Sequence, residues 1–135
     1  MNSERLTACI ISQKWNAAIQ AGLVMPLWLL GDFVDDFRLR AHTHEEKMAL
    51  AGDPPLWIEA AEHADCNAYL AAVVETLCRE AGLQAPSWTE SPRCYLHRPW
   101  FAGGLENLKA ILLAESPVPF RRRNLFVSAN VLVRV

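Results

Sequence analysis

Residues 66–83, CNAYLAAVVETLCREAGL, decide the predicted fold because they form the longest helical pattern in the chain. Apolar side chains recur there every three or four residues, the spacing that places them on one face of an α-helix. Gly82 is a typical C-terminal stop, and Leu83 is placed to close over the last turn. The pattern predicts a long helix with one buried face, formed by Cys66, Tyr69, Leu70, Val73, Leu77, Cys78 and Ala81.

Three further helices are predicted before this long one. The first runs from an N-cap at Ser3 to about Ala21, and the second begins near Pro26, because proline is favourable in a first helical turn. The third follows Thr43-His44-Glu45-Glu46, which is a capping-box sequence. Asp53-Pro54-Pro55 then interrupts the chain ahead of the long helix.

An irregular segment and two or three short helices are predicted after the long helix. Residues 84–104 contain three prolines and four aromatic residues, and aromatic side chains in so long a loop must pack on the helices or on a partner. A helix is expected over residues 105–112, closed by Ser116-Pro117. A short helix should then carry residues 121–123, and Ser128 can cap a final turn.

These elements predict one all-α domain. The chain has 135 residues, which is the usual size of a single domain, so residues 1–135 are expected to form one unit. Its 52% hydrophobic composition suffices for a core without disulfides or metal. No alternation of apolar and polar residues is long enough to predict a strand. We expect about five to seven helices and a long loop rich in aromatic residues and proline.

Composition and cysteine spacing indicate a cytoplasmic protein that does not enter membranes. The four cysteines form no CxxC pair, which favours reduced thiols. The longest apolar run, residues 21–30, contains Pro26 and is too short to cross a bilayer. A formal net charge of −2 argues against a dedicated nucleic-acid binder, which is expected to be strongly basic.

Residues 115–128, ESPVPFRRRNLFVS, carry the sharpest functional signal in the chain. Three arginines lie between large apolar residues, so they belong to a folded element rather than to a solvated tail. The flanking Phe120, Leu125 and Phe126 are too apolar to remain in water together and are expected to pack inward. Consecutive helical residues point about 100° apart, so Arg121, Arg122 and Arg123 cannot all face one ligand. One or two are expected to bind within the protein. Arg122 is our first choice for an outward arginine, and reversing its charge is expected to leave the fold nearly intact. Guanidinium groups bind carboxylates and phosphates alike, so an acidic protein, a phosphate and bulk solvent all stay open.

The same region resembles a known group of proteins. The resemblance is carried by Asp53-Pro54, residues 85–89 (APSWT), residues 98–101 (RPWF) and residues 115–128. These segments are similar to those of a widespread group of small, largely uncharacterised bacterial proteins that end in an SP-x-x-FRRRN-[IL]-F motif. Some members resemble the C-terminal regions of helix-turn-helix regulators, and others are encoded beside nucleotidyltransferase-like toxins. The resemblance implies an antitoxin-like or toxin-partner role, and it covers about residues 53–135.

No catalytic, cofactor or metal site is predicted. Asp32, Asp35 and Asp36 are interpreted as a solvated helix face, because no calcium-binding loop accompanies them. Cys94 and His97 have a spacing that could converge on zinc, but no further ligands are indicated. The sequence contains no GxSxG elbow, P-loop, GxGxxG or HExxH motif.

The sequence therefore favours a non-catalytic bacterial protein-interaction module, antitoxin-like, with an acidic protein partner. The predicted partner-binding residues are Arg121, Arg122, Arg123, Trp100 and Phe101. The first alternative is a nucleic-acid-binding regulator that uses the three arginines on phosphates. The second alternative is an enzyme with an unrecognised site near His97 and Trp100.

Overall fold

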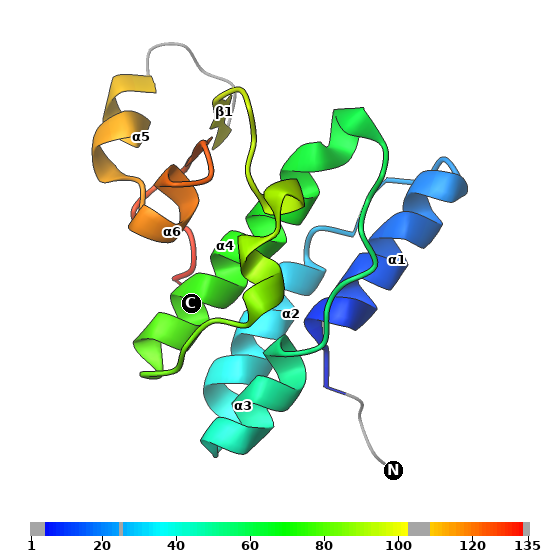
Figure 1. Cartoon of the computed structure of the whole chain (residues 1–135), viewed down its shortest axis with the longest axis vertical. Coiled ribbons are helices and arrows are strands. Elements are labelled where there is room, and N and C mark those ends of the chain that lie inside the picture. Colours follow the sequence, from blue (N-terminus) through cyan, green and yellow to red (C-terminus); the bar gives the residue numbers. More distant parts are fainter. Residues whose placement is uncertain (1–4, 25, 103–108, 134–135) are drawn as a thin grey trace.

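Six α-helices and one short pair of parallel strands make up the computed structural model, which describes residues 5–24, 26–102 and 109–133. The long helix α4 (Ala64–Glu80) runs diagonally through the molecule, with α1 and α2 on one side of it and α5 and α6 on the other (Figure 1). The described part of the chain is a compact helical domain, as predicted. None of its helices is both long and apolar enough to cross a membrane.

The helix α1 (Ala8–Gln20) begins later than predicted. Thr7 is its N-cap, and the Thr7 hydroxyl accepts a hydrogen bond of 3.0 Å from the Ile10 amide. The predicted cap Ser3 lies outside the described residues. The helix ends at Gly22, whose φ of 68° allows the Leu23 amide to reach the Ala18 carbonyl at 2.9 Å.

The helices α2 (Leu29–Asp35) and α3 (His44–Ala51) form one end of the domain. A turn over residues 26–28 precedes α2, so this helix starts three residues after the predicted Pro26, and it continues as a π-helical turn (Asp36–Arg40). The predicted capping box at α3 is confirmed: Thr43 and Glu46 bind each other's backbone amides.

Asp36 corrects the prediction of a solvated acidic face. Its side chain is buried. The Leu6 amide donates to one carboxylate oxygen at 2.8 Å, and Arg40 binds the other. Asp36 therefore links the segment before α1 to the π-helical turn that follows α2. Helical spacing alone cannot reveal such a long-range contact.

The helix α4 buries a wider face than the sequence pattern indicated. Leu70, Val73 and Leu77 belong to the predicted stripe, and the small residues Ala68, Ala71 and Ala72 are buried beside them. Small side chains let other segments approach this helix closely on both flanks. The predicted C-terminal stop is confirmed: Gly82 has a φ of 73°, and the Leu83 amide bonds to the Cys78 carbonyl at 2.8 Å.

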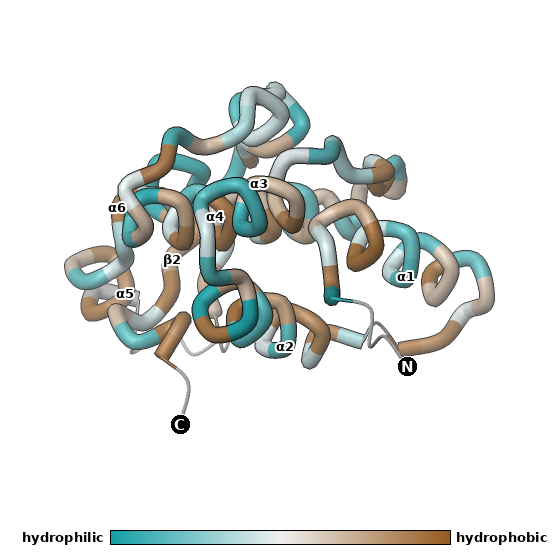
Figure 2. Tube along the Cα trace, turned by 90° about the horizontal axis from the view of Figure 1, so that it is seen from below, coloured by the Kyte–Doolittle hydropathy of each residue, from teal (hydrophilic) through white to brown (hydrophobic). Residues whose placement is uncertain are grey.

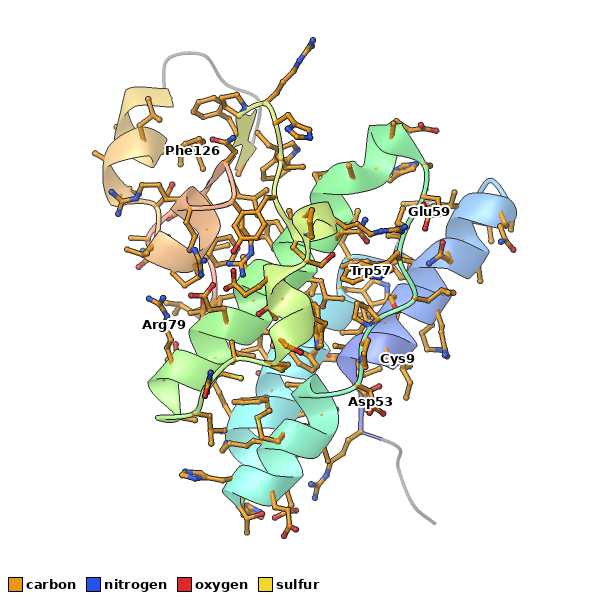
Figure 3. The ribbon with its side chains drawn as sticks, viewed as in Figure 1. Cys9, Asp53, Trp57, Glu59, Arg79 and Phe126 are labelled. Carbon is orange, nitrogen blue, oxygen red and sulfur yellow. The ribbon has the colours of Figure 1, made fainter. Side chains whose placement is uncertain are left out.

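The predicted irregular segment contains two 3₁₀ turns (Ser87–Glu90 and Pro92–Cys94) that pack against α4. A strand β1 (Trp100–Phe101) follows and pairs in parallel with β2 (Leu125–Phe126). Phe101 stacks on Phe126, with ring centres 5.1 Å apart, and Figure 3 shows the position of Phe126. No strand was predicted, because two residues are too few to show an alternating pattern.

The C-terminal region is built from α5 (Lys109–Glu115), α6 (Val118–Arg121), β2 and a final turn. The predicted short helix ends at Arg121, so Arg122 and Arg123 lie in a turn that Asn124 closes with a φ of 65°. Phe120, Leu125 and Phe126 are buried, as predicted. This turn points the last two arginines back toward α4.

Candidate functional site

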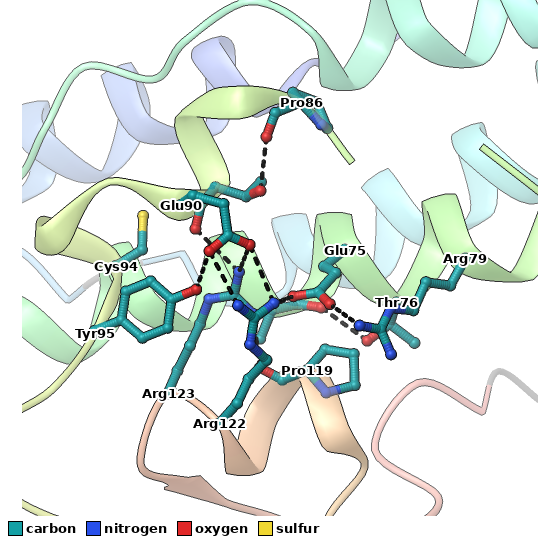
Figure 4. A network of polar contacts seen from close by, with 12 residues as sticks. Glu75, Thr76, Arg79, Pro86, Glu90, Cys94, Tyr95, Pro119, Arg122 and Arg123 are labelled. Carbon is teal, nitrogen blue, oxygen red and sulfur yellow. Dashed lines mark hydrogen bonds and ion pairs between the residues drawn. The ribbon is translucent and has the colours of Figure 1, made fainter. Parts of the chain in front are cut away.

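Glu75 on α4 is the centre of an arginine network. Its carboxylate is 3% exposed, and three guanidinium groups surround it (Figure 4). One oxygen accepts from Arg123 at 2.5 Å and from Arg122 at 2.9 Å, while the other accepts from Arg79 at 2.6 Å. A buried carboxylate of this kind is expected to require cationic partners. Here the C-terminal motif supplies two of them.

Arg123 is an interior residue, with an exposed fraction of 0%. Besides the Glu75 contact, it donates to the Pro119 carbonyl at 2.7 Å and to the Thr89 carbonyl at 3.0 Å. Its guanidinium lies 5.1 Å from the centre of the Tyr95 ring. Arg123 therefore ties the C-terminal turn to α4 and to the 3₁₀ turn at Thr89, and it presents no surface to a partner.

Arg122 bridges the two carboxylates of the network. It makes two parallel hydrogen bonds to Glu90, of 3.1 and 3.0 Å, in addition to its bond to Glu75. The Tyr95 hydroxyl also donates to Glu90, and this bond, together with Arg122, lowers the pKa of the Glu90 carboxyl group. The bond to Glu90 in turn raises the pKa of Arg122. Arg122 is partly exposed, but most of its donors are already used within the chain.

Arg121 is the outward member of the three. It is exposed, and its guanidinium donates to the Ser116 carbonyl at 3.0 Å. Among the described residues no carboxylate pairs with it. The network itself does not include Arg121. It contains two carboxylates, those of Glu75 and Glu90, and three guanidinium groups, so its formal charge is only +1.

The predicted aromatic contacts Trp100 and Phe101 lie apart from the arginines. Phe101 is engaged with Phe126, whereas half-buried Trp100 packs edge-on against Tyr69, with ring centres 5.9 Å apart. The Tyr69 ring also packs against Phe120, with ring centres 5.2 Å apart. These rings lie between Trp100 and the turn of residues 121–124, which we call the arginine turn. The structure therefore does not gather the five predicted residues on one surface.

An apolar pocket lies beside Trp100, and it was not predicted from the sequence. Its volume is about 290 Å³. It is lined by segments distant in sequence, from α1, α2, α4, β1 and the C-terminal turn, which is why no local pattern marks it. The lining residues are Trp15, Leu27, Leu30, Gly31, Val34, Asp65, Cys66, Tyr69, Trp100, Val131, Leu132 and Val133.

A second feature missed from the sequence is the exposed apolar segment between α1 and α2. We call it the apolar connection and define it as Leu23, Val24, Leu27 and Trp28. Val24 is 93% exposed, and Leu23 and Trp28 are each 68% exposed. The chain leaving α1 is correspondingly brown, and therefore apolar, in Figure 2. The only signal for it was the apolar run at residues 21–30, which a buried helix would equally explain.

The described residues contain no group of three potential metal ligands. Cys94 is buried, its thiol faces the Trp88 carbonyl, and burial raises its pKa to about 12, while His97 is exposed. The Cys94–His97 pair thus does not form a site. None of the four cysteines forms a disulfide, as predicted.

No protein family, curated protein or solved structure matches the chain. The candidate sites therefore rest on the geometry of this chain alone.

Proposed function

We propose that the protein is a non-catalytic interaction module of the bacterial cytoplasm, antitoxin-like, which binds a protein partner through the apolar connection. The observation that carries this proposal is the exposure of four large apolar side chains in one short segment, Leu23, Val24, Leu27 and Trp28. Large apolar side chains that are exposed together, rather than singly, are typical of protein-binding sites. Free thiols support the cytoplasmic location.

The energetics favour a contact at this segment. Burying a large apolar side chain contributes about 1.5–3 kcal/mol, so two or three of these residues could supply much of the free energy of a specific complex. Two contacts hold parts of the segment to the domain: Gly22 closes α1, and the Trp15 indole donates to the Pro26 carbonyl at 3.4 Å. Each such contact lowers the conformational entropy that is lost on binding.

The arginines offer less to a partner than their number suggests. Arg123 is buried and Arg122 is bidentate with Glu90, so binding of an external carboxylate or phosphate would have to break existing pairs. Arg121 is the arginine that we assign to an acidic partner. The same pairing removes the support for the nucleic-acid alternative, which needs several free cations on one face.

The resemblance of residues 53–135 to bacterial proteins encoded beside nucleotidyltransferase-like toxins suggests the kind of partner. We propose such a toxin, bound and held inactive in a stable complex. A protein that inhibits by covering a surface needs no catalytic residues of its own, so the proposal requires no reactive centre in this chain.

Co-expression with the product of the neighbouring gene, followed by purification of the tagged protein, tests this function. A complex of fixed stoichiometry and relief of growth arrest are expected from the wild type. Val24→Ser with Trp28→Ser should abolish both effects. Leu39→Ser, at another exposed leucine outside the apolar connection, is the matched control and should abolish neither.

Two results would redirect the proposal. Loss of the complex in Arg121→Glu, with full binding by the Val24→Ser, Trp28→Ser variant, would move the contact to the arginine turn. Submicromolar binding of duplex DNA at physiological salt would instead favour the nucleic-acid alternative. The logarithm of the binding constant should then fall against the logarithm of the salt concentration with a slope of about −2.7.

A further inference from the structure

The apolar pocket beside Trp100 has an aromatic wall and one carboxylate. Trp15, Tyr69 and Trp100 are aromatic residues of its lining, and Asp65 is its acidic lining residue. Asp65 lies in the first turn of α4, and no described residue forms an ion pair or hydrogen bond with its side chain. Aromatic rings attract cations through their negative faces, and tryptophan does so most strongly. The lining thus favours positive charge without offering an internal cation.

We propose that this pocket binds a small alkylated ammonium compound, one whose nitrogen carries methyl or other alkyl groups in place of most of its hydrogens. This inference goes beyond the proposed interaction function and does not depend on it.

The scarcity of hydrogen-bond acceptors in the pocket selects an alkylated cation over a primary amine. A primary ammonium group has three N–H donors, and each needs an acceptor once it leaves water. Among the described residues that line the pocket, Asp65 is the only one with a charged acceptor, and the others are mostly aliphatic or aromatic. A quaternary nitrogen has no N–H donor, so its desolvation leaves no unsatisfied hydrogen bond. Its methyl groups can also pack against Leu30, Val34 and the rings.

The size of the pocket limits the ligand. A volume of about 290 Å³ is at the low end for ligand pockets and is equivalent to roughly ten water molecules. A trimethylammonium group with a short substituent fits this space, whereas a drug-sized cation does not.

The wall formed by the C-terminal turn is fixed rather than loose. Arg38 donates to the Leu132 carbonyl at 2.6 Å and makes two hydrogen bonds, of 3.0 and 2.8 Å, to Glu80 at the end of α4. Arg38 therefore holds in place the C-terminal residues that form one side of the pocket. The cavity is already formed before a ligand arrives, which reduces the cost of binding.

The experiment compares choline with its uncharged carbon isostere, dimethylbutanol, by titration calorimetry and by the NMR shifts of the tryptophan indole groups. The two probes have the same shape, so their difference in affinity isolates the charge. We expect choline to bind at least tenfold more tightly, with the indole signals of Trp15 and Trp100 shifting most.

Two variants assign the effect to the pocket. Asp65→Asn should reduce choline affinity at least tenfold and leave dimethylbutanol binding unchanged. Asp32→Asn, which removes an exposed carboxylate of α2 outside the pocket lining, should change neither affinity. Trp100→Phe keeps an aromatic side chain in β1 and should weaken choline binding only partially, by about threefold.

The proposal is overturned if choline and dimethylbutanol bind equally or if neither shifts the indole signals. It is also overturned if Asp32→Asn weakens choline binding as much as Asp65→Asn does, since the attraction would then be a general effect of negative charge.

Discussion

The C-terminal motif and the apolar connection show opposite relations between sequence and surface. Arg123 lies in the most strongly charged stretch of the chain, yet it is completely buried and pairs with Glu75. Val24 lies in the longest apolar run, yet it is almost completely exposed. In the C-terminal motif, paired charges thus stabilise the interior. In the apolar connection, apolar side chains form the surface.

The difference teaches that pairing, and not residue type, decides which groups are available to a partner. A guanidinium that is bound by carboxylates and carbonyls has few hydrogen-bond donors available to a partner. The arginine turn therefore acts mainly to stabilise the fold. The exposed leucine, valine and tryptophan side chains have no such internal partner, and contact with another protein would remove them from water. The following predictions test each side of this comparison.

Removal of Glu75 should have the largest effect. Glu75→Ala removes the close carboxylate of buried Arg123 and leaves only Glu90, at 3.9 Å, as its ionic partner. Breaking a buried ion pair in this way destabilises a fold by about 3–5 kcal/mol. The free energy of unfolding from urea titration measures this loss. Glu80→Ala is the matched control on the same helix: its exposed pair with Arg38 should contribute at most about 1 kcal/mol. Equal losses in the two variants would mean that the network does not fasten the fold.

Ser116 offers a second test of the same region, with a smaller expected effect. Its buried hydroxyl accepts from the Val127 amide at 2.9 Å and donates toward the Leu112 carbonyl. Ser116→Ala leaves the Val127 amide buried without a partner, which should cost about 1–3 kcal/mol. Ser87→Ala, at an exposed serine, should change stability by less than about 0.5 kcal/mol. An unchanged urea midpoint in Ser116→Ala would contradict the role of this hydroxyl.

The network should also make stability depend on acid. The hydrogen bond from Tyr95, and then Arg122, hold the pKa of Glu90 below its ordinary value of 4.5. Because the folded state keeps the carboxylate ionised more readily, this stabilisation is present above the unfolded pKa and is lost as the pH falls through the lower folded pKa. Urea midpoints should therefore be flat near neutrality and decline below about pH 4.5. Glu90→Gln should reduce the decline, whereas Glu62→Gln, at an exposed position, should leave it unchanged.

The helical architecture was predictable because its signals are local. The stripe and glycine stop of α4, the capping box of α3 and the inward packing of Phe120 were each visible within a few residues of sequence. The misplaced start of α1 and the two short strands show the limit of local signals, since caps compete and a two-residue pair leaves no periodicity.

The candidate sites could not be predicted in the same way because tertiary contacts create them. The partner of Arg123 lies 48 residues earlier in the chain, and no sequence pattern links the two positions. The sequence also suggested that reversing the charge of Arg122 would spare the fold. In the structure this change would place a third carboxylate beside Glu75 and Glu90, so we now expect Arg122→Glu to destabilise the protein.

The apolar connection provides the last and smallest effect, and it completes the comparison. Val24→Ser with Trp28→Ser should change the free energy of unfolding by less than about 0.5 kcal/mol per site, because both side chains are largely exposed in the folded domain. The urea midpoint measures this, and the same variant should lose the partner complex. Trp15→Ser is the contrasting change at a buried tryptophan, where about 3–5 kcal/mol should be lost. A loss above about 2 kcal/mol in the double variant would show that these residues are already packed in solution. It would remove the observation on which the proposed interaction surface depends.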